Sequence, residues 1–328
     1  MVSDTLVLST PEELSSRINL REGETKLGEK AQTIASLDKL QDCSARFVLL
    51  GIPEDTGVVA NHGIAGASTA WEPALKALLN TQENTFLKGE DLLVLGHFHF
   101  PPLAEAQQED LYSQVSYIDD QVSPVLEHIF RAGKVPIVVG GGHNNAYPII
   151  KGFSKALGQK VQVLNIDAHA DLRPTLGRHS GNGFSYAIQD GYLDHYGIFG
   201  LQQNYLTAYM QEYMLRNKAI KYRFYEDLLL QGDIHRSWRS FMEDFAEPLG
   251  LEIDLDAIQN VLSSATSPSG FSVAEIRSIL LSTSKKFAYL HLAEGAVELA
   301  DGRRSPLTAK LIAYLVTDFL KGKQALKG

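Results

Sequence analysis

The sequence of 328 residues lacks the features that tie a protein to membranes, nucleic acid or an oxidising compartment. A single cysteine, Cys43, excludes both an intrachain disulfide and a zinc site built from cysteines. The formal net charge of −9 leaves no basic excess for nucleic acid or an anionic membrane surface. No apolar run reaches membrane-span length, and residues 1–21 contain no signal-peptide core. We therefore expect a cytoplasmic protein with no nucleic-acid or membrane partner.

What the chain does have is a hydrophobic content of 44% and short apolar runs that alternate with helical patterns. This alternation predicts an α/β protein, a three-layer α/β/α fold whose sheet is mainly parallel. Strands are expected at residues 47–51, 92–96, 135–139, 161–164, 196–201, 250–256 and 287–292. Helices are expected at residues 71–79, 111–132, 273–283 and 307–320, with 207–247 mostly helical.

The first 44 residues differ from the rest in being polar and only partly helical by pattern. Thr10 followed by Pro11 is typical of a helix cap with proline in the first turn. No internal repeat, low-complexity tract or long linker divides the remaining chain. We interpret residues 1–44 as an N-terminal extension and residues 45–328 as one domain.

Side chains that can bind a metal follow four of the predicted strands. In chain order they are His143; then Asp167, His169 and Asp171; then Asp254 and Asp256; and finally Glu294. The carboxyl ends of parallel strands share one edge of a sheet, so these side chains are expected to converge. Six His and Asp ligands suit two divalent ions that share carboxylate bridges, with Mn, Zn or Fe as candidates. Without cations, four clustered aspartates would repel one another.

Simpler interpretations exist for the individual motifs. The stretch around Asp167 could by itself be a solvated turn after a strand. The glycines before His143 could form a phosphate-binding loop, but no Lys-Ser/Thr pair follows them. His97 and His99 have no carboxylate close by in the sequence, so we interpret them as packed or exposed side chains.

Taken together, the motifs resemble the arginase/agmatinase/formiminoglutamase (ureohydrolase) family. The resemblance lies in GGGH at 140–143, DAHAD at 167–171, the paired aspartates of EIDLDA, and LAEG around Glu294. It extends from about residue 46 to the C-terminus and is strongest toward formiminoglutamase. It implies an arginase-like fold with two Mn²⁺ per chain.

The resemblance also implies roles for individual residues. Two aspartates would bridge the ions and two further pairs would complete the sites: Asp167 and Asp254 bridging, His143 and Asp171 in one site, His169 and Asp256 in the other. Asp171 would also accept a hydrogen bond from the attacking water. Glu294 would anchor the cationic amidine or guanidinium group of the substrate.

Departures from the family pattern concern the substrate. Phe184 stands near the position where arginases and agmatinases carry a proton-shuttling histidine, whereas Arg173 and the SGNGF segment resemble formiminoglutamases. His179 is close enough in sequence to replace that histidine as an acid, the alternative being a surface histidine on a loop. Ile64 replaces an arginine in the early loop, and residues 257–260 lack the usual Asp-Pro. The expected substrate contacts are Arg173, Asn182, Asn61 and Glu294.

These features predict a binuclear manganese hydrolase of a C–N bond in a linear amidine, with N-formimino-L-glutamate and water giving L-glutamate and formamide. The alternatives are an arginase or agmatinase acting on a guanidino compound, or a non-catalytic arginase-fold protein. Deacetylases of similar architecture use one zinc and a His-His pair, which this sequence lacks. The expected partner is a small molecule, and assembly into a homo-oligomer is left open.

Overall fold

The computed structural model describes residues 5–101, 103 and 106–322, so residues 1–4 of the predicted extension and 323–328 of the predicted domain lie outside it. The strands form a nine-stranded sheet in the order β1-β3-β2-β4-β9-β8-β5-β6-β7. All neighbours are parallel except β1 and β3, which are antiparallel. The strands are β1 (Leu6–Leu8), β2 (Phe47–Gly51), β3 (Leu92–Phe98), β4 (Val135–Val139), β5 (Val161–Ile166), β6 (Leu193–Leu201), β7 (Ile220–Phe224), β8 (Leu249–Asp254) and β9 (Phe287–Ala293).

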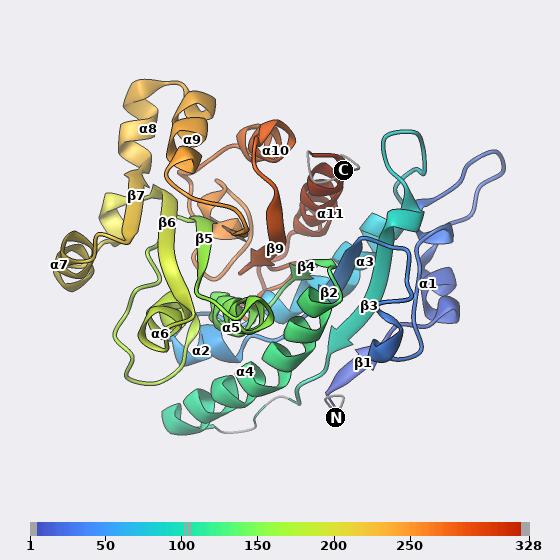
Figure 1. Ribbon diagram of the computed structural model, residues 1–328, viewed down its shortest axis with the longest axis horizontal. Coiled ribbons are helices and arrows are strands. Elements are labelled where there is room, and N and C mark those ends of the chain that lie inside the picture. The colour runs from blue at the N-terminus through green and yellow to red at the C-terminus, as the bar shows by residue number, and fades with distance from the viewer. Residues whose placement is uncertain (1–4, 102, 104–105, 323–328) are drawn as a thin grey trace.

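Helices cover both faces of this sheet, as Figure 1 shows. The described α-helices are α1 (Pro11–Arg17), α2 (Thr56–Ala60), α3 (Trp71–Leu79), α4 (Gln108–Arg131), α5 (Ala146–Leu157), α6 (Gly183–Gln189), α7 (Ala208–Arg216), α8 (Tyr225–Gln231), α9 (Ile234–Glu243), α10 (Val273–Ser282) and α11 (Leu307–Lys321). Successive side chains of a strand point to opposite faces, so β2 contributes to two cores. Phe47 and Leu49 pack in the core with α3 and α11, whereas Val48 and Leu50 pack in the core with α4 and α5. The predicted three-layer, mainly parallel fold is thereby confirmed.

The segment predicted to be mostly helical, residues 207–247, contains strand β7 between α7 and α8. Helices α7, α8 and α9 make up most of the segment, as predicted, but the strand was missed because it lies at the edge of the sheet and is only partly buried. Its charged residues Lys221 and Arg223 alternate with the apolar ones, so no continuous apolar run marks it. Charged side chains are common on such edges, where they discourage pairing with another chain.

The described part of the predicted extension packs against the sheet. Strand β1 pairs with β3, and Leu14 and Leu27 are buried in the core that contains α3. The predicted cap is confirmed: the Thr10 hydroxyl accepts a hydrogen bond from the Glu13 N–H at 3.2 Å, in front of α1. The division of the chain at residue 44 stays a prediction.

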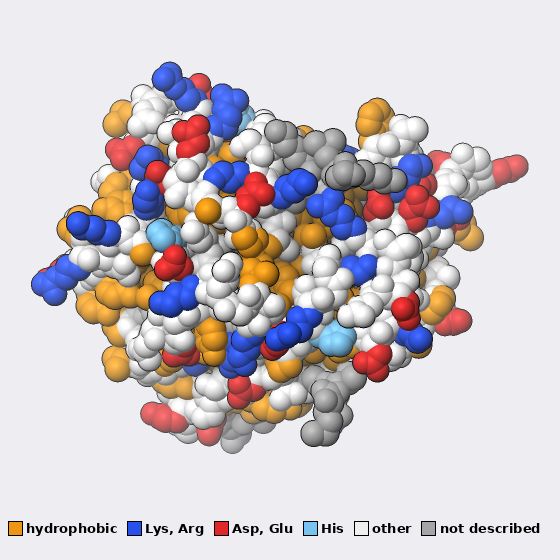
Figure 2. Space-filling model, viewed as in Figure 1, with side chains coloured by type: hydrophobic (Ala, Val, Ile, Leu, Met, Phe, Trp, Pro, Cys, Tyr) orange, Lys and Arg blue, Asp and Glu red, His pale blue; other side chains and the backbone are white. Residues whose placement is uncertain are grey.

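The surface carries charges of both signs, as a composition of 30 Lys and Arg against 39 Asp and Glu requires. On the face shown in Figure 2, acidic and basic side chains are interspersed, with hydrophobic side chains between them. Among the helices in the described ranges, none is long and apolar enough to cross a membrane.

Candidate metal centre

Four of the predicted ligands meet around one nitrogen of His143. The Nδ1 atom lies 3.2 Å from Asp167 Oδ2, 3.0 Å from Asp171 Oδ2 and 3.2 Å from Asp254 Oδ2. These atoms come from the carboxyl ends of β4, β5 and β8, which the parallel sheet places at one edge. They lie close enough together to surround a single ion. We call His143, Asp167, Asp171 and Asp254 the first ligand group.

A second ligand group consists of Asp167, His169 and Asp256. His169 Nδ1 lies 3.1 Å from Asp256 Oδ2 and 3.7 Å from Asp167 Oδ1. Asp167 therefore faces the first group with Oδ2 and the second with Oδ1, the arrangement of a bridging carboxylate. Asp254 faces only the first group, and its Oδ1 accepts the Asp256 N–H at 2.8 Å. A bridging role for Asp254 stays a prediction.

The turn that carries His143 is held by buried contacts beneath it. Gly140 and Gly141 after β4 have φ of 92° and 76°, a region that favours glycine. A Cβ atom on Gly141 would clash with Asn145 Nδ2. The buried carboxylate of Glu54 accepts hydrogen bonds from Asn145 Nδ2 at 2.6 Å and from the Gly142 N–H at 3.3 Å. These contacts fix the direction in which His143 leaves the strand.

The electrostatics of both groups fit divalent cations. Although burial opposes a charged ring, the carboxylates of Asp167, Asp171 and Asp254 raise the pKa of His143 well above its usual value. Burial, followed by the charges of Asp256 and Asp167, also raises the pKa of Asp254. The centre thus holds more negative charge than it can keep unneutralised, and protons and metal ions compete for the same atoms.

The lack of hydrogen-bond partners at several buried atoms also fits bound cations. Within the described part of the chain, neither nitrogen of His143 has a hydrogen-bond partner, and Asp256 Oδ1 also lacks one. Buried polar atoms are normally paired, so unpaired atoms that face a cluster of carboxylates mark an ion site. Imidazole and carboxylate ligands suit manganese, and the residues present therefore fit the two ions that the sequence motifs imply.

Asp171 and Glu294 stand in the left-handed backbone region, with φ of 48° and 63°. Such backbone costs about 1–3 kcal/mol for a residue other than glycine and is typical of functional sites. Glu294 follows β9, and its Oε1 accepts the His143 N–H at 2.8 Å. Burial raises the pKa of Glu294 to about 8. The carboxyl group is thus held beside the ligand groups, where a cation would favour its charged form.

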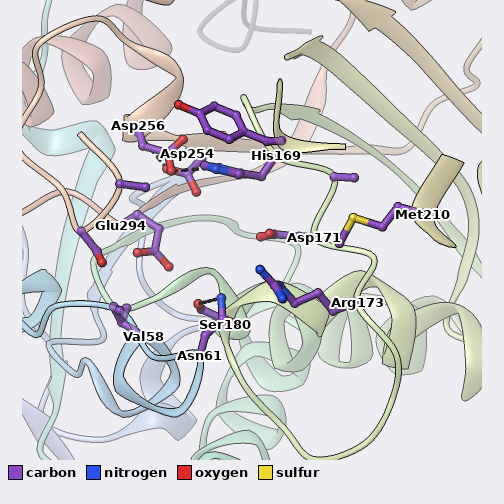
Figure 3. A pocket seen from close by; sticks show the side chains of 15 residues that line it. Val58, Asn61, His169, Asp171, Arg173, Ser180, Met210, Asp254, Asp256 and Glu294 are labelled. Atoms are coloured by element: carbon purple, nitrogen blue, oxygen red, sulfur yellow. Dashed lines mark hydrogen bonds and ion pairs between the residues drawn. The ribbon is translucent and has the colours of Figure 1, made fainter. Parts of the chain in front are cut away.

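A cavity of about 220 Å³ opens over the ligand groups. Figure 3 shows His169, Asp254 and Asp256 together on one side, with Glu294 on another and Arg173 pointing inward from a third. The other lining residues include Asn61, Ser180, Ser264, Tyr205 and Met210. A cavity with carboxylates at one end and a guanidinium group at the other suits a small molecule that carries both charges.

Of the predicted substrate contacts, Asn61, Arg173 and Glu294 line this cavity. Asn61 Nδ2 donates to Ser180 Oγ at 3.2 Å, and the Arg173 N–H donates to the Gly181 carbonyl at 3.0 Å. A Cβ atom on Gly181 would lie 2.9 Å from Arg173 Cδ and 3.0 Å from Asn61 Nδ2. Glycine at this position lets the two side chains approach each other at the cavity wall.

Asn182 and His179 do not line the cavity. Asn182 is fully buried: its Oδ1 accepts from Arg178 Nη1 and the His179 N–H, and its Nδ2 donates to the carbonyls of Pro174 and Gly177. Its amide is occupied within its own loop, so the expectation that it contacts substrate is corrected to a role in shaping that loop. Both residues belong to the same turn as Ser180, and sequence proximity alone could not tell which side chains face the cavity.

His179 has the properties of a loop residue. Its Nδ1 accepts the Gly181 N–H at 3.1 Å, as a cap in front of a short turn. Burial, and after it the charges of Arg173 and Arg178, lower the pKa of His179 to about 4. A ring that is neutral at pH 7 and faces its own loop is a poor proton donor, which speaks against the predicted acid role.

Three functional features were not anticipated from the motifs. The Tyr205 ring packs at a tilt of 35° against the His169 ring, with centroids 4.4 Å apart. Arg178 holds the loop of Arg173 in place through Asp119. Glu252 lies 3.6 Å from His143, on the side away from the ligand groups. Glu252 could have been found from the sequence, since it precedes Asp254 and Asp256 with the same alternate spacing.

The fold and the His/Asp centre define an arginase-like α/β protein. The chain belongs to the arginase family, because the model of the Arginase family matches residues 45–320. The resemblance noted from the motifs is thereby confirmed.

Similar proteins carry related names. A formimidoylglutamase from Streptococcus pyogenes serotype M3 is 28% identical over 224 residues, which are 64% of this chain and 63% of that protein. The chain therefore matches less than two thirds of that relative's length. A Trypanosoma cruzi formiminoglutamase solved with Mn²⁺ superposes with a TM-score of 0.73 and 20% identity, covering 91% of this chain and 99% of the other. A Bacillus subtilis formimidoylglutamase superposes with a TM-score of 0.76 and 15% identity, and the superposition covers 94% of this chain and 94% of the other. These two structures confirm the arginase-like fold.

Proposed function

We propose that this protein is a metal-dependent hydrolase that converts N-formimino-L-glutamate and water to L-glutamate and formamide. The observation that carries the proposal is the cavity, which joins two ligand groups linked by Asp167 to an inward-pointing Arg173. The names of the similar proteins support this substrate, and the Mn²⁺ with which the Trypanosoma cruzi formiminoglutamase was solved supports manganese. The small-molecule substrate and the cytoplasmic location belong to the same proposal, whereas assembly into a homo-oligomer stays open.

Two Mn²⁺ ions would be held by the six His and Asp side chains of the two groups. Bound divalent cations supply a water molecule that ionises near neutral pH and serves as the nucleophile. Asp171 lies at the edge of the first group, and its carboxylate points into the cavity in Figure 3. We assign to it the hydrogen bond that orients the attacking water.

We assign to Glu294 the binding of the amidine head of the substrate. Its Oε1 is engaged by the His143 N–H, which leaves the carboxyl group fixed and facing the cavity. An amidinium cation would pair with the Glu294 carboxylate through charge-assisted hydrogen bonds. The carbon of the head is thereby presented to the water.

The reaction transfers a water molecule across one C–N bond. The water oxygen bonds to the amidine carbon, and the bond from that carbon to the glutamate nitrogen breaks. Both protons of the water end on the leaving nitrogen, which departs as the ammonium group of L-glutamate, while the two hydrogens already on the amidinium nitrogen stay in formamide. His179 is not needed for either transfer in this scheme.

The glutamate end of the substrate would lie toward Arg173 and Asn61. The Arg173 guanidinium can bind a carboxylate through two parallel hydrogen bonds. Ile64, which replaces the family's arginine, packs in a small apolar cluster with Leu262 and Leu299. Its N–H donates to Ser264 Oγ at 2.8 Å, so the early loop is anchored to the cavity wall without a second arginine.

The arginase and agmatinase alternative finds no supporting contact. Phe184 is fully buried and packs edge-on against His143, with centroids 5.2 Å apart, and flat against Tyr196 at 4.2 Å. It neither reaches the cavity lining nor carries a proton. Both kinds of substrate expel an amine that must gain a proton, but a guanidinium head is more strongly resonance-stabilised than a formimino head. Because Phe184 cannot carry a proton, its presence should therefore slow arginine hydrolysis more. A non-catalytic protein would have no physical reason to retain four repelling aspartates.

The test is a substrate panel on protein loaded with Mn²⁺. We expect N-formimino-L-glutamate to be hydrolysed at least about tenfold better than arginine or agmatine by kcat/KM, or about 1.4 kcal/mol in transition-state binding. Release of glutamate and formamide measures the first substrate, and release of urea the others. Asp167→Asn, purified in parallel, controls for contaminating hydrolases. Equal or better turnover of arginine would overturn the assignment.

A further inference from the structure

A row of polar side chains crosses the centre of the sheet directly beneath the ligand groups. Asn165 of β5 pairs with Glu252 of β8, and Glu252 pairs with His291 of β9, so the three stand side by side on neighbouring strands. All three are fully buried. Asn165 and Glu252 precede the ligands Asp167 and Asp254 by two residues and therefore share their face of the sheet. Polar groups in a core are costly, so this row requires a reason.

Glu252 is the centre of this row. The Tyr289 hydroxyl donates to its Oε1 at 2.7 Å, and its Oε2 lies 2.5 Å from His291 Nδ1. The same Oε2 lies 3.6 Å from His143 Nε2, slightly beyond hydrogen-bond length. Tyr289 and His291 lie on one face of β9, because they are two residues apart. The carboxylate is therefore held from one side by two donors and approaches His143 on the other.

His143 needs an acceptor at that place. Its Nδ1 faces the first ligand group, whereas its Nε2 has no hydrogen-bond partner in the described ranges. An imidazole that binds a metal through Nδ1 carries its proton on Nε2. That proton must point to an acceptor if the buried ring is to be satisfied, and the nearby carboxylate oxygen of Glu252 is placed to receive it.

We propose that Glu252, held in place by Tyr289 and His291, is a positioning residue that fixes the ring orientation and tautomer of His143 for metal binding. The inference rests on the proposed function in that the six-ligand centre must hold metal ions. Glu252 touches neither substrate nor the reacting atoms. Its effect should therefore appear first in the affinity for metal.

The alternative to a positioning role is a third ion site at Glu252, and the same experiment tests it. His143 Nε2, the Glu252 carboxylate and His291 lie close enough to hold an ion themselves. That would require His143 to bind metals through both nitrogens, with no proton on the ring. The Tyr289 hydroxyl also occupies one Glu252 oxygen, which favours positioning over a third ion site.

The experiment compares Mn²⁺ binding by metal-free wild type and by Glu252→Gln. Equilibrium dialysis with Mn²⁺ alone gives affinity and stoichiometry without reference to activity, and the metal-free melting temperature is measured in parallel. We expect Glu252→Gln to bind one of the two ions about 10- to 100-fold more weakly, because lost support of a ligating histidine has effects of this size. Tyr289→Phe keeps the carboxylate and removes one of its hydrogen-bond donors, so Mn²⁺ affinity should also fall, but by less. This variant tests the inference on its own if Glu252→Gln fails to fold.

The matched control is Asp318→Asn. Asp318 lies in α11, remote from the ligand groups, and its carboxylate is also buried. It accepts a hydrogen bond from the Arg277 guanidinium at 2.6 Å. We expect it to lower the metal-free melting temperature while Mn²⁺ affinity stays within about twofold of wild type. Unchanged affinity in both Glu252→Gln and Tyr289→Phe, or a third ion bound by wild type and lost in Glu252→Gln, would overturn the inference alone. Wild-type protein that binds no Mn²⁺ would overturn the proposed function as well.

Discussion

Arg178 and Asp119 form a buried, two-pronged ion pair that ties the loop after β5 to helix α4. Arg178 Nε donates to Asp119 Oδ2 at 2.8 Å, and Nη2 donates to Oδ1 at 3.1 Å. Nη2 also donates to the carbonyl of Asn144 at 3.0 Å, the residue after His143. The guanidinium lies 4.8 Å from the Tyr147 ring centre and 5.0 Å from that of Tyr186. One side chain thus connects the loop that carries Arg173 to the turn that carries the candidate ligand His143.

This pair should be needed for stability. Arg178→Ala leaves the Asp119 carboxylate buried without its partner, and we expect a loss of about 3–5 kcal/mol in the free energy of unfolding. Urea denaturation followed by circular dichroism measures it. Arg131→Ala removes an exposed partner of Glu127 from the same helix and should cost less than about 1 kcal/mol. Equal losses in the two variants would show that the buried pair has no special weight.

The convergence of the six candidate ligands could be predicted because it depends on two simple regularities. Short motifs place each ligand directly after an apolar run, and the carboxyl ends of parallel strands meet at one edge. Neither regularity requires knowledge of side-chain packing. The central strands could be predicted equally well: β2 and β4 are continuous apolar runs, and both have the predicted bounds. Strand β1 has only three residues, and β7 alternates charged with apolar residues; both lie at the edges of the sheet and are partly exposed, so their patterns are weak.

The predicted substrate contacts could be told apart only in part, because two of them, Arg173 and Asn182, lie on one loop whose side chains face opposite ways. Arg173 reaches the cavity, whereas the side-chain amide of Asn182, nine positions later, forms hydrogen bonds within its own loop. What decides between them is the anchoring of that loop by Arg178. That contact joins residues 59 positions apart in the sequence, so no local sequence pattern predicts it. The acid role of His179 stays a prediction, and the hydrogen bond from the Gly181 N–H to its ring speaks against it.

The two ligand groups make a prediction about metal content. Because Asp167 contributes one oxygen to each group, Asp167→Ala should bind close to no Mn²⁺, whereas Asp256→Ala should retain about one ion in the first group. Elemental analysis after gentle purification, with wild type close to two ions, is the measurement. If Asp254 also bridges, Asp254→Ala will resemble Asp167→Ala more than Asp256→Ala. One ion retained in both Asp167→Ala and Asp256→Ala would contradict the shared role of Asp167.

His179 provides a prediction of pH dependence. Its pKa of about 4 in the folded protein lies below the usual value near 6.5, so the unfolded chain takes up the proton first as the pH falls. Stability should therefore be fully present above about pH 6.5 and decrease toward pH 4. In His179→Asn the amide oxygen can still accept the Gly181 N–H, and the decrease attributable to His179 should vanish. Urea midpoints between pH 7.5 and 4 measure this.

The same variant tests the role of His179 in the reaction. A ring that is neutral at pH 7 and accepts a hydrogen bond from its own loop is not poised to donate a proton. We expect His179→Asn to keep most of the wild-type kcat at pH 7.5. His179→Ala, which removes the acceptor as well, should lose stability at every pH. A large fall in kcat for a fully folded His179→Asn would restore this residue as the acid.

Arg173 provides the sharpest test of substrate choice. Its guanidinium points into the cavity from the side across from His169, Asp254 and Asp256, where a carboxylate of the substrate would lie (Figure 3). Because this contact is made equally before and during the reaction, Arg173→Met should raise KM for N-formimino-L-glutamate about tenfold and change kcat little. Arg173→Lys keeps the charge but loses the paired geometry, so an intermediate KM is expected. Agmatine has no carboxylate, and any residual turnover of it should be insensitive to both substitutions. A fall in kcat at unchanged KM would instead place Arg173 in the chemical step.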